Sequence, residues 1–258
     1  MKYIDIGCNL FCRKFEDKES LIVKNAEDKD VHMIITGSSI KSSQRASDYV
    51  LNRTGIWSTA GVHPHDAKSC DDNTFSILED LIVHNPNIVA VGECGLDYDR
   101  MYSPKEIQLQ RFQEQVKLAH KLNKPLFLHE REAFDDMADI LSKQSNLHAV
   151  VHCFTGSREQ AEKYLELGCY IGVTGWICDD RRNQDVLDAL EIIPIEKLMV
   201  ETDAPYLLPR KIKGLKNPNV PENITYVVDK IAAVKGMDPE EVRKITLENT
   251  IQFFGLSV

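Results

Sequence analysis

Four side chains that could bind a metal ion stand at or just beyond the ends of short apolar runs. Glu93, His129 and His152 each directly follow such a run, and Asp203 comes three residues after another. Imidazole nitrogens and carboxylate oxygens without thiolates suit a hydrolytic Mg²⁺, Mn²⁺ or Zn²⁺ centre better than a structural zinc site. We therefore expect Glu93, His129, His152 and Asp203 to bind a divalent metal ion.

A metal ion in such a site would activate water. It lowers the pKa of a bound water molecule from ~16 toward ~7, so that hydroxide forms near neutral pH. Asp203 could ligate the metal, accept the proton of the attacking water, or do both. Because a carboxylate such as Glu93 can bridge two ions, the residues alone leave one or two ions open.

Histidines and aromatic residues close to the apolar runs are candidates for contacts with substrate. His63 and His65 flank Pro64, which restrains the turn, and either could hydrogen-bond a phosphate or protonate a leaving group. We assign His63 a catalytic role. Aromatic side chains that follow strands could stack on nucleobases, although packing is the alternative for Phe154, Trp176 and Tyr206. The residues that we expect to bind substrate are His65, Arg131, Phe154 and Tyr206.

Glu201 lies two residues before Asp203, so the two side chains should point the same way from an extended strand. A buried carboxylate at that position needs a polar partner. We expect Glu201 to support a metal ligand or Arg131.

Apolar runs and helical patterns alternate from one end of the chain to the other. We predict strands at residues 3–7, 31–36, 57–62, 88–92, 126–128, 149–151, 170–173 and 197–200. We predict helices at residues 18–28, 42–52, 73–84, 104–122, 133–144, 158–167, 183–190, 221–234 and 239–253.

About eight strand–helix units in series predict an α/β protein, a single (β/α)8 TIM barrel over residues 1–258. An open doubly wound sheet is the alternative, but it would concentrate the ligands at one switch point. In a barrel the active site lies at the C-terminal ends of the strands, where the four candidate ligands stand.

Composition limits the classes of function. The net charge is −9, which argues against a sequence-reading DNA-binding protein but not against a nuclease, because a metal ion supplies local positive charge. A basic segment follows Asp203, and it could attract phosphate or simply be a solvated loop. Its members are Arg210, Lys211, Lys213 and Lys216.

The expected compartment is the cytoplasm. The seven cysteines are an odd number without a CxxC pair, which argues against a disulfide framework. No apolar stretch approaches the ~18 residues of a membrane span, and the first residues do not resemble a signal peptide. We expect no membrane association and no obligate protein partner.

Four motifs resemble those of the TatD family of metal-dependent deoxyribonucleases. They are WSTAGVHPH at 57–65, GECGLD at 92–97, HCFTG at 152–156 and ETDAPYL at 201–207. The resemblance implies an amidohydrolase-type TIM barrel with Glu93, His129, His152 and Asp203 as metal ligands. It also implies Mg²⁺-dependent exonuclease action on the 3′ ends of single-stranded DNA or RNA, with a role in DNA repair.

The chain departs from the family pattern in two places. Many relatives carry Asp-x-His-x-His at the end of the first strand, whereas Gly7 and Asn9 follow Asp5 here, as in the bacterial TatD branch. Loss of two nitrogen ligands favours Mg²⁺ over Mn²⁺ or Zn²⁺ and leaves Asn9 to support the remaining ligands. The sequence NPNVPE at 217–222 replaces a frequent Arg-Asn-Glu-Pro, so a contact of that arginine is in doubt.

Two other functions are compatible with the fold. A metal-dependent amide or ester hydrolase, such as an amidohydrolase or a D-aminoacyl-tRNA deacylase, would keep the metal and change the substrate. Many amidohydrolases use a carbamylated lysine and the histidines of the first strand, where this chain has Glu93 and Asn9. A binding protein without activity is disfavoured by the four retained ligand residues.

Overall fold

The computed structural model describes residues 1–257, over which strands and helices alternate as predicted. The strands are β1 (Tyr3–Cys8), β2 (Val31–Ile35), β3 (Ile56–Ala60), β4 (Ile88–Asp97), β5 (Leu126–Arg131), β6 (Ala149–Val151), β7 (Tyr170–Val173) and β8 (Leu198–Val200). The α-helices are α1 (Glu19–Glu27), α2 (Ile40–Val50), α3 (Thr74–His84), α4 (Lys105–Leu122), α5 (Phe134–Ser142), α6 (Arg158–Glu166), α7 (Gln184–Ile192), α8 (Ile224–Lys235) and α9 (Pro239–Phe254).

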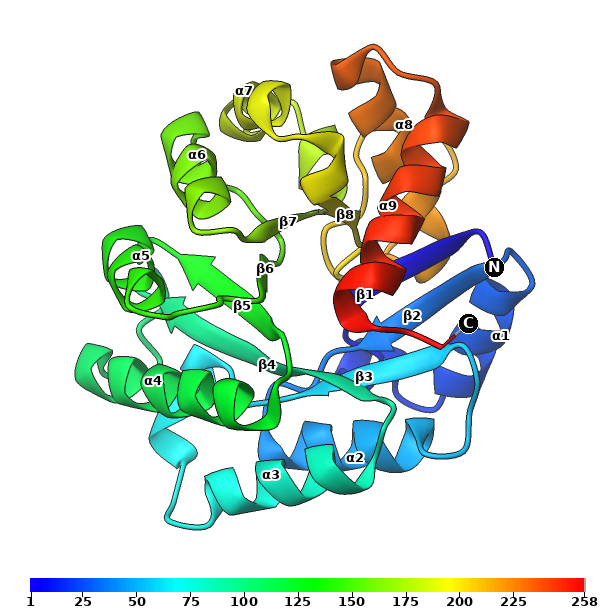
Figure 1. The fold of residues 1–258 in the computed structure, drawn as a ribbon. Coiled ribbons are helices and arrows are strands. Elements are labelled where there is room, and N and C mark those ends of the chain that lie inside the picture. Colours follow the sequence, from blue (N-terminus) through cyan, green and yellow to red (C-terminus); the bar gives the residue numbers. More distant parts are fainter. Residues whose placement is uncertain (258) are drawn as a thin grey trace. The chain divides into compact units, whose positions relative to one another are not determined.

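The eight strands form one sheet in which their order follows the chain from β1 to β8 (Figure 1). The pairs β1–β2, β3–β4, β4–β5, β5–β6 and β7–β8 are all parallel. An isolated parallel bridge joins Cys8, the last residue of β1, to Ala204, which follows β8. The first and last strands of the order therefore meet, as a (β/α)8 barrel requires.

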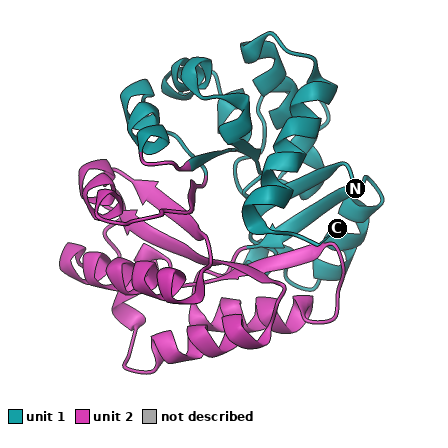
Figure 2. Ribbon diagram, viewed as in Figure 1, with its two compact units in different colours: residues 1–35, 153–166, 170–258 teal, residues 36–152, 167–169 magenta. Residues whose placement is uncertain are grey.

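The chain divides into two compact units (Figure 2). Unit 2 consists of Thr36–His152 and Leu167–Cys169 and contains β3 to β6. Its helices α2, α3 and α4 pack beside β3 and β4 (Figure 1). Every residue of β4 is buried, which is typical of a central parallel strand.

Unit 1 consists of Met1–Ile35, Cys153–Glu166 and the chain from Tyr170 onward. It contains β1, β2, β7 and β8, and its helices include α8 and α9, which pack on each other. Asp238 begins α9 by accepting hydrogen bonds from the backbone N–H groups of Glu240 and Glu241, and Pro239 occupies the first turn. A single domain over residues 1–258 stays a prediction.

Two strands are longer than the sequence pattern predicts. β4 continues through Glu93 to Asp97, and β5 continues through His129 to Arg131. The prediction that Glu93 and His129 stand where their strands stop was therefore wrong. The prediction ends each strand at its first polar residue. In the structure, β4 and β5 stay paired in parallel as far as Asp97 and Arg131.

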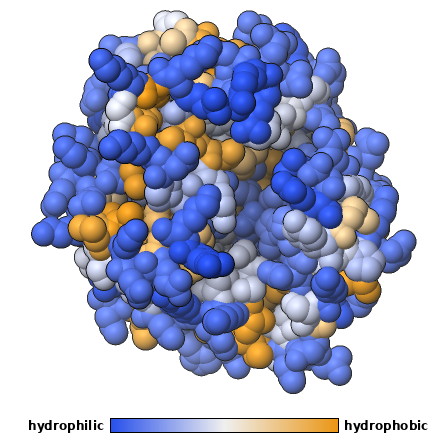
Figure 3. Space-filling model, turned by 180° about the vertical axis from the view of Figure 1, so that it is seen from behind, coloured by the Kyte–Doolittle hydropathy of each residue, from blue (hydrophilic) through white to orange (hydrophobic). Residues whose placement is uncertain are grey.

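The outer surface carries mainly polar side chains. Seen from the side opposite to Figure 1, hydrophilic residues prevail and hydrophobic ones form small separate patches (Figure 3). Among the described residues, no helix has the length and apolar character needed to cross a membrane.

Candidate metal centre

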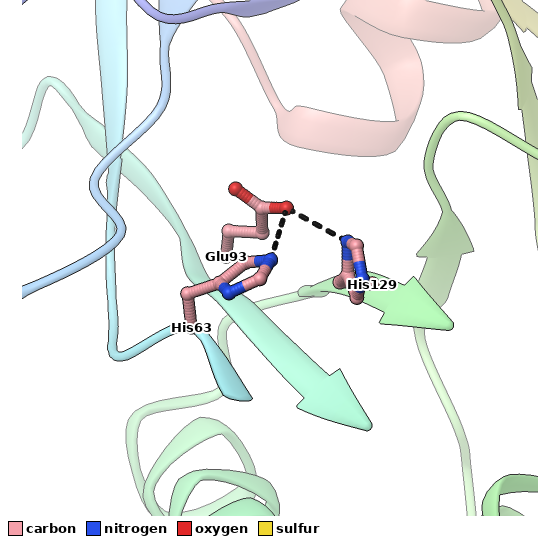
Figure 4. A group of neighbouring side chains, drawn as sticks. All are labelled: His63, Glu93 and His129. Atoms are coloured by element: carbon pink, nitrogen blue, oxygen red, sulfur yellow. Dashed lines mark hydrogen bonds and ion pairs between the residues drawn. The ribbon is translucent and has the colours of Figure 1, made fainter. Parts of the chain in front are cut away.

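One carboxylate oxygen of unit 2 is surrounded by three imidazole rings. Glu93 Oε1 lies 2.9 Å from His152 Nε2, 3.1 Å from His129 Nδ1 and 3.3 Å from His63 Nε2. Figure 4 shows one ring nitrogen of His63 and one of His129 directed toward this same oxygen of Glu93. The ligand atoms of His63, Glu93 and His129 all lie within 4.8 Å of one another, and His152 contacts the same oxygen of Glu93.

Strand pairing places these side chains. β4 and β5 pair in parallel, with Gly95 opposite His129. Gly95 has a φ of +145°, and a Cβ atom there would lie 1.9 Å from the His129 carbonyl oxygen. Only glycine fits this close approach, which brings the backbone of His129 against the strand that carries Glu93.

His129 faces a carboxylate with each of its ring nitrogens. Nδ1 lies 3.1 Å from Glu93 Oε1, and Nε2 lies 3.2 Å from Asp97 Oδ2. With both nitrogens protonated, the ring can donate a hydrogen bond to each carboxylate, because ionised carboxylates only accept hydrogen bonds. The two hydrogen bonds raise the pKa of His129 although burial lowers it.

The same charges hold both carboxylates ionised. Burial opposes ionisation of Glu93, but the nearby imidazoles of His63 and His152 and the hydrogen bonds from His129 and His152 place its pKa well below the usual value. Burial likewise opposes ionisation of Asp97, and hydrogen bonds from His129 and His65 outweigh it and lower the pKa. The group therefore offers negative charge to a cation.

His63 has a fixed tautomer. Its Nδ1 accepts a hydrogen bond of 3.1 Å from the backbone N–H of His65, so Nδ1 carries no proton. The hydrogen of the neutral ring must then be on Nε2, which faces Glu93. Burial lowers the pKa of His63 and favours this neutral form. His63 is thus arranged as a hydrogen-bond donor through Nε2, in line with the predicted catalytic role rather than with metal ligation.

The donor set fits a small divalent cation. Two atoms that each lie ~2.1 Å from one ion are ~3.0 Å apart at a right angle and ~3.4 Å apart at a tetrahedral angle. The separations around Glu93 Oε1 fall in or just below this range, at 2.9–3.3 Å. Glu93, His129 and His152 could therefore hold a metal ion after small movements of their side chains. Asp97 would then orient His129 through its other nitrogen, as carboxylates commonly do for zinc-bound histidines.

Comparison with known proteins places the chain in a family. The sequence model described as TatD related DNase matches residues 4–255. The chain belongs to the TatD family. It is 41% identical to the 3'-5' ssDNA/RNA exonuclease TatD of Rahnella sp. (strain Y9602), over 98% of each chain. It is 38% identical to the protein of the same name from Escherichia coli (strain K12), over 98% of this chain and 99% of that one.

Solved structures of TatD proteins share the fold. The structure of YJJV, a TatD homolog from Escherichia coli K12, matches with a TM-score of 0.90 and 28% identity, over 99% of both chains. The TatD family hydrolase from Entamoeba histolytica matches with a TM-score of 0.86 and 28% identity, over 98% of both chains. The predicted family and the predicted (β/α)8 barrel are confirmed, and the chain is an enzyme of a metal-dependent nuclease family.

Asp203 belongs to unit 1, where it contacts the residue that replaces a family histidine. The side-chain amide of Asn9 donates a hydrogen bond of 2.8 Å to Asp203 Oδ1. The backbone N–H of Asn9 also donates to the carbonyl oxygen of Ala204, at 2.7 Å. Asn9 therefore holds one oxygen of the Asp203 carboxylate, which is the supporting role expected of it.

Glu201 is fully buried and accepts a hydrogen bond from the backbone N–H of Cys153. Cys153 directly follows His152, so Glu201 holds the backbone next to a candidate ligand. This contact corresponds to the first of the two roles expected of Glu201. Arg131 instead forms an ion pair of 3.0 Å with Asp99.

The residues expected to bind substrate differ in their surroundings. His65 is partly exposed, and its Nε2 lies 2.8 Å from Asp97 Oδ2. Tyr206 and Arg131 are exposed at 43% and 45%, so both are accessible. Phe154 is only 3% exposed and meets Tyr164 edge-on, with ring centroids 6.3 Å apart. This burial favours the packing alternative for Phe154 over stacking on a base.

Asp97 is not among the residues predicted for the site, yet it is buried and contacts both His65 and His129. Its position carries a signal that could have revealed it. Glu93, Gly95 and Asp97 alternate along one strand, so the two carboxylates share a face of β4. Prediction of a strand end at Gly92 hid this pattern.

Proposed function

We propose that the protein is a metal-dependent 3′–5′ exonuclease that hydrolyses phosphodiester bonds of single-stranded DNA or RNA. The observation that carries the proposal is the group of imidazoles around Glu93 Oε1 in a chain that belongs to the TatD family. Curated relatives at 38–41% identity bear the name of such an exonuclease. The metal that we propose is Mg²⁺, with Mn²⁺ and Zn²⁺ as alternatives.

The metal ligands that we propose are Glu93, His129, His152 and Asp203. When bound, the ion would polarise the phosphoryl group and make its water acidic enough to attack at neutral pH. The low pKa of Glu93 keeps this carboxylate available as a ligand.

The remaining residues position substrate and move protons. Asp203 accepts the proton of the attacking water through the carboxylate oxygen that Asn9 does not occupy. His63 donates from Nε2 to a phosphate oxygen or to the departing oxygen of the next nucleotide, since its Nδ1 is held as an acceptor. His65 and Arg131 are exposed enough to contact phosphates of the strand.

A strand labelled at its 5′ end tests the reaction and its direction together. With Mg²⁺, removal of nucleotides from the 3′ end leaves a ladder of labelled, progressively shorter products. Chelation should stop the reaction, and Asp203→Asn should lower kcat by at least about 100-fold because a proton acceptor is lost. The variant should unfold at the same temperature as the wild-type protein.

Two results would contradict the proposal. Immediate release of the label as a mononucleotide would show the opposite polarity. Full activity of Asp203→Asn would remove Asp203 from the mechanism. A parallel panel of cyclic amides and aminoacylated tRNA distinguishes the amide or ester hydrolases that the same fold could support.

A further inference from the structure

Unit 1 contains a pocket of about 400 Å³ between two loops that follow β7 and β8. One wall comes from the 3-10 turn Gly175–Cys178 and the residues after it, and the other from residues 207–217. The two walls meet at Gly175, whose backbone approaches Leu207 so closely that a Cβ atom would lie 2.3 Å from the Leu207 carbonyl oxygen. The second wall begins four residues after Asp203, at the same ends of the strands.

A buried carboxylate gathers arginines at this pocket. Asp179, with a side chain only 4% exposed, binds Arg181 through two contacts of 2.7 and 2.6 Å. The Nε atoms of Arg182 and Arg210 lie 3.1 and 3.8 Å from the same carboxylate. Three guanidinium groups against one carboxylate leave a local charge of +2 in a protein whose net charge is −9.

These guanidinium groups are available to a ligand. Arg182 and Arg210 are exposed at 44% and 54%, and they approach Asp179 through Nε. Each guanidinium has five N–H donors, so their terminal nitrogens can still donate to an anion. A phosphate is the anion that such planar, paired donors bind best.

An aromatic ring lies beside these charges. The guanidinium carbon of Arg182 sits 3.5 Å from the centre of the Trp176 ring, and the indole N–H donates to the Arg182 carbonyl oxygen at 3.1 Å. The indole is thereby held flat against a cation. Stacking surfaces beside positive charge are characteristic of sites for single-stranded nucleic acids, because any base can stack while the backbone is neutralised.

We infer that this pocket is a subsite for a nucleotide of the substrate strand, with Arg182 and Arg210 on a phosphate and Trp176 and the Arg182 plane against a base. The inference rests on the proposed nuclease function for the identity of the strand. It also explains how a protein of net negative charge can retain a polyanion, because the arginines around Asp179 give the strand a local positive site.

Binding of a nuclease-resistant, single-stranded oligonucleotide tests the subsite without requiring turnover. The double variant Arg182→Ala/Arg210→Ala should bind about ten-fold or more weakly, because two phosphate contacts are lost. The slope of log affinity against log salt concentration should fall by ~0.7, the amount expected when one phosphate of a single strand is no longer neutralised. Hydrolysis of bis(4-nitrophenyl) phosphate, a phosphodiester with no nucleotide to place in the pocket, should stay at the wild-type rate.

The matched control is Lys163→Ala/Lys244→Ala, which removes two positive charges from exposed positions of α6 and α9 outside the pocket. It should bind the oligonucleotide like the wild type. An equal loss in the control, or wild-type affinity in the arginine variant, would overturn the subsite. Arg181 still neutralises Asp179 in the double variant, so the fold should persist, which thermal unfolding checks.

Trp176 provides a second readout that needs no change to the arginines. The chain has two tryptophans, and Trp57 is buried in β3. A saturating oligonucleotide should therefore change the fluorescence of the wild type and leave that of Trp176→Phe unchanged. No change in the wild type, or an equal change in Trp176→Phe, would contradict stacking at this ring.

Further outcomes separate this inference from the proposed function. Binding that depends on the arginines without any cleavage would refute the exonuclease and support the subsite. Cleavage with arginine-independent binding would refute the subsite alone. Absence of all binding would refute both. If inorganic phosphate reproduces the fluorescence change at low concentration, the pocket is an anion site and the strand subsite is wrong.

Discussion

At the scale of single residues, the candidate centre depends on one oxygen atom that serves three imidazoles. Glu93 Oε1 has two good acceptor directions, yet three ring nitrogens lie within 3.3 Å of it. This crowding of donor atoms around one carboxylate oxygen supports the proposed metal site. The second ring nitrogen distinguishes two of the histidines. That of His129 faces Asp97, whereas that of His63 accepts a hydrogen bond from the backbone of His65.

Glu93→Gln should weaken binding of Mg²⁺ or Mn²⁺ by more than about 100-fold, because the negative charge at the centre of the three rings is removed. The amide oxygen can still accept hydrogen bonds from the rings, so the fold should remain. Calorimetric titration measures the affinity. Glu106→Gln, at an exposed position of α4, is the control and should bind metal like the wild type. Unchanged affinity in Glu93→Gln would remove Glu93 from the ligand set.

Asp97→Asn tests the residue that sequence patterns missed. The amide holds His129 and His65 less firmly than the carboxylate does, and it no longer favours charge on the ring. Metal affinity should fall by about 10–100-fold, the usual effect of a residue that orients a ligand. If affinity is unchanged while only stability falls, Asp97 has a structural role and does not orient the ligand.

At the scale of elements, glycines set the approach of β4 to β5. Gly92 and Gly95 both have a φ of +145°, and in each case a Cβ atom would collide with the backbone of β5. The candidate ligands Glu93 and His129 are therefore positioned by the close backbone contact that Gly92 and Gly95 allow.

Gly95→Ala should destabilise the protein by about 3 kcal/mol or more, since the added carbon meets the carbonyl of His129 at 1.9 Å and φ is unfavourable. Metal affinity should fall with it, because the backbone of a ligand is displaced. Gly168→Ala is the matched control: its φ of +88° is also unfavourable, but no atom lies within 4 Å of the new carbon. It should cost only about 1–2 kcal/mol. If Gly95→Ala and Gly168→Ala lose the same free energy of unfolding, the close contact between β4 and β5 does not contribute to the loss.

The join between β1 and the segment after β8 carries a buried acid. Asp5 accepts hydrogen bonds from the backbone N–H groups of Thr202 and Gly7 and from the Thr202 hydroxyl. Burial nevertheless raises its pKa to about 8. Between pH ~4 and ~8 the folded protein then holds a proton that the unfolded chain has lost, so stability falls as pH rises through this window.

Asp5→Asn should remove this component of the pH dependence, which reaches up to roughly 1.4 kcal/mol per pH unit. The asparagine keeps an acceptor for Thr202 and Gly7. Urea unfolding near pH 5 and near pH 8 should show a smaller difference for Asp5→Asn than for the wild type. Asp48→Asn, exposed on α2, should leave the difference unchanged. Identical slopes for wild type and Asp5→Asn would mean that Asp5 is ionised throughout.

The sequence predicted the elements well and their ends less well. Pairing of β4 with β5 continues past the apolar runs because backbone hydrogen bonds do not depend on side-chain type, so β4 ends at Asp97 rather than near Gly92. Residue types at strand positions pointed to Glu93, His129 and His152, which lie close together in the structure, and their role as metal ligands stays a prediction. The burial of Phe154 depends on contacts with α6 that no local pattern encodes.

At the scale of the whole molecule, a bound cation should stabilise the fold. At a concentration 100 times the dissociation constant, it adds about 2.7 kcal/mol to the free energy of unfolding if the unfolded chain does not bind it. Thermal unfolding with added Mg²⁺ or with a chelator measures this difference. In Glu93→Gln the same additions should have little effect, and an equal effect there would indicate that the ion binds elsewhere.

His129, whose two nitrogens both point at carboxylates, has a consequence for loading of the centre. A ring protonated at both positions has no lone pair to give, so an arriving ion must expel a proton before the nitrogen can coordinate it. Metal binding should therefore release protons to the solvent. Acidic solution should oppose binding, and an unbuffered solution should become more acidic as the metal binds. The heat released on loading should accordingly vary with the ionisation enthalpy of the buffer, by an amount that counts the protons displaced.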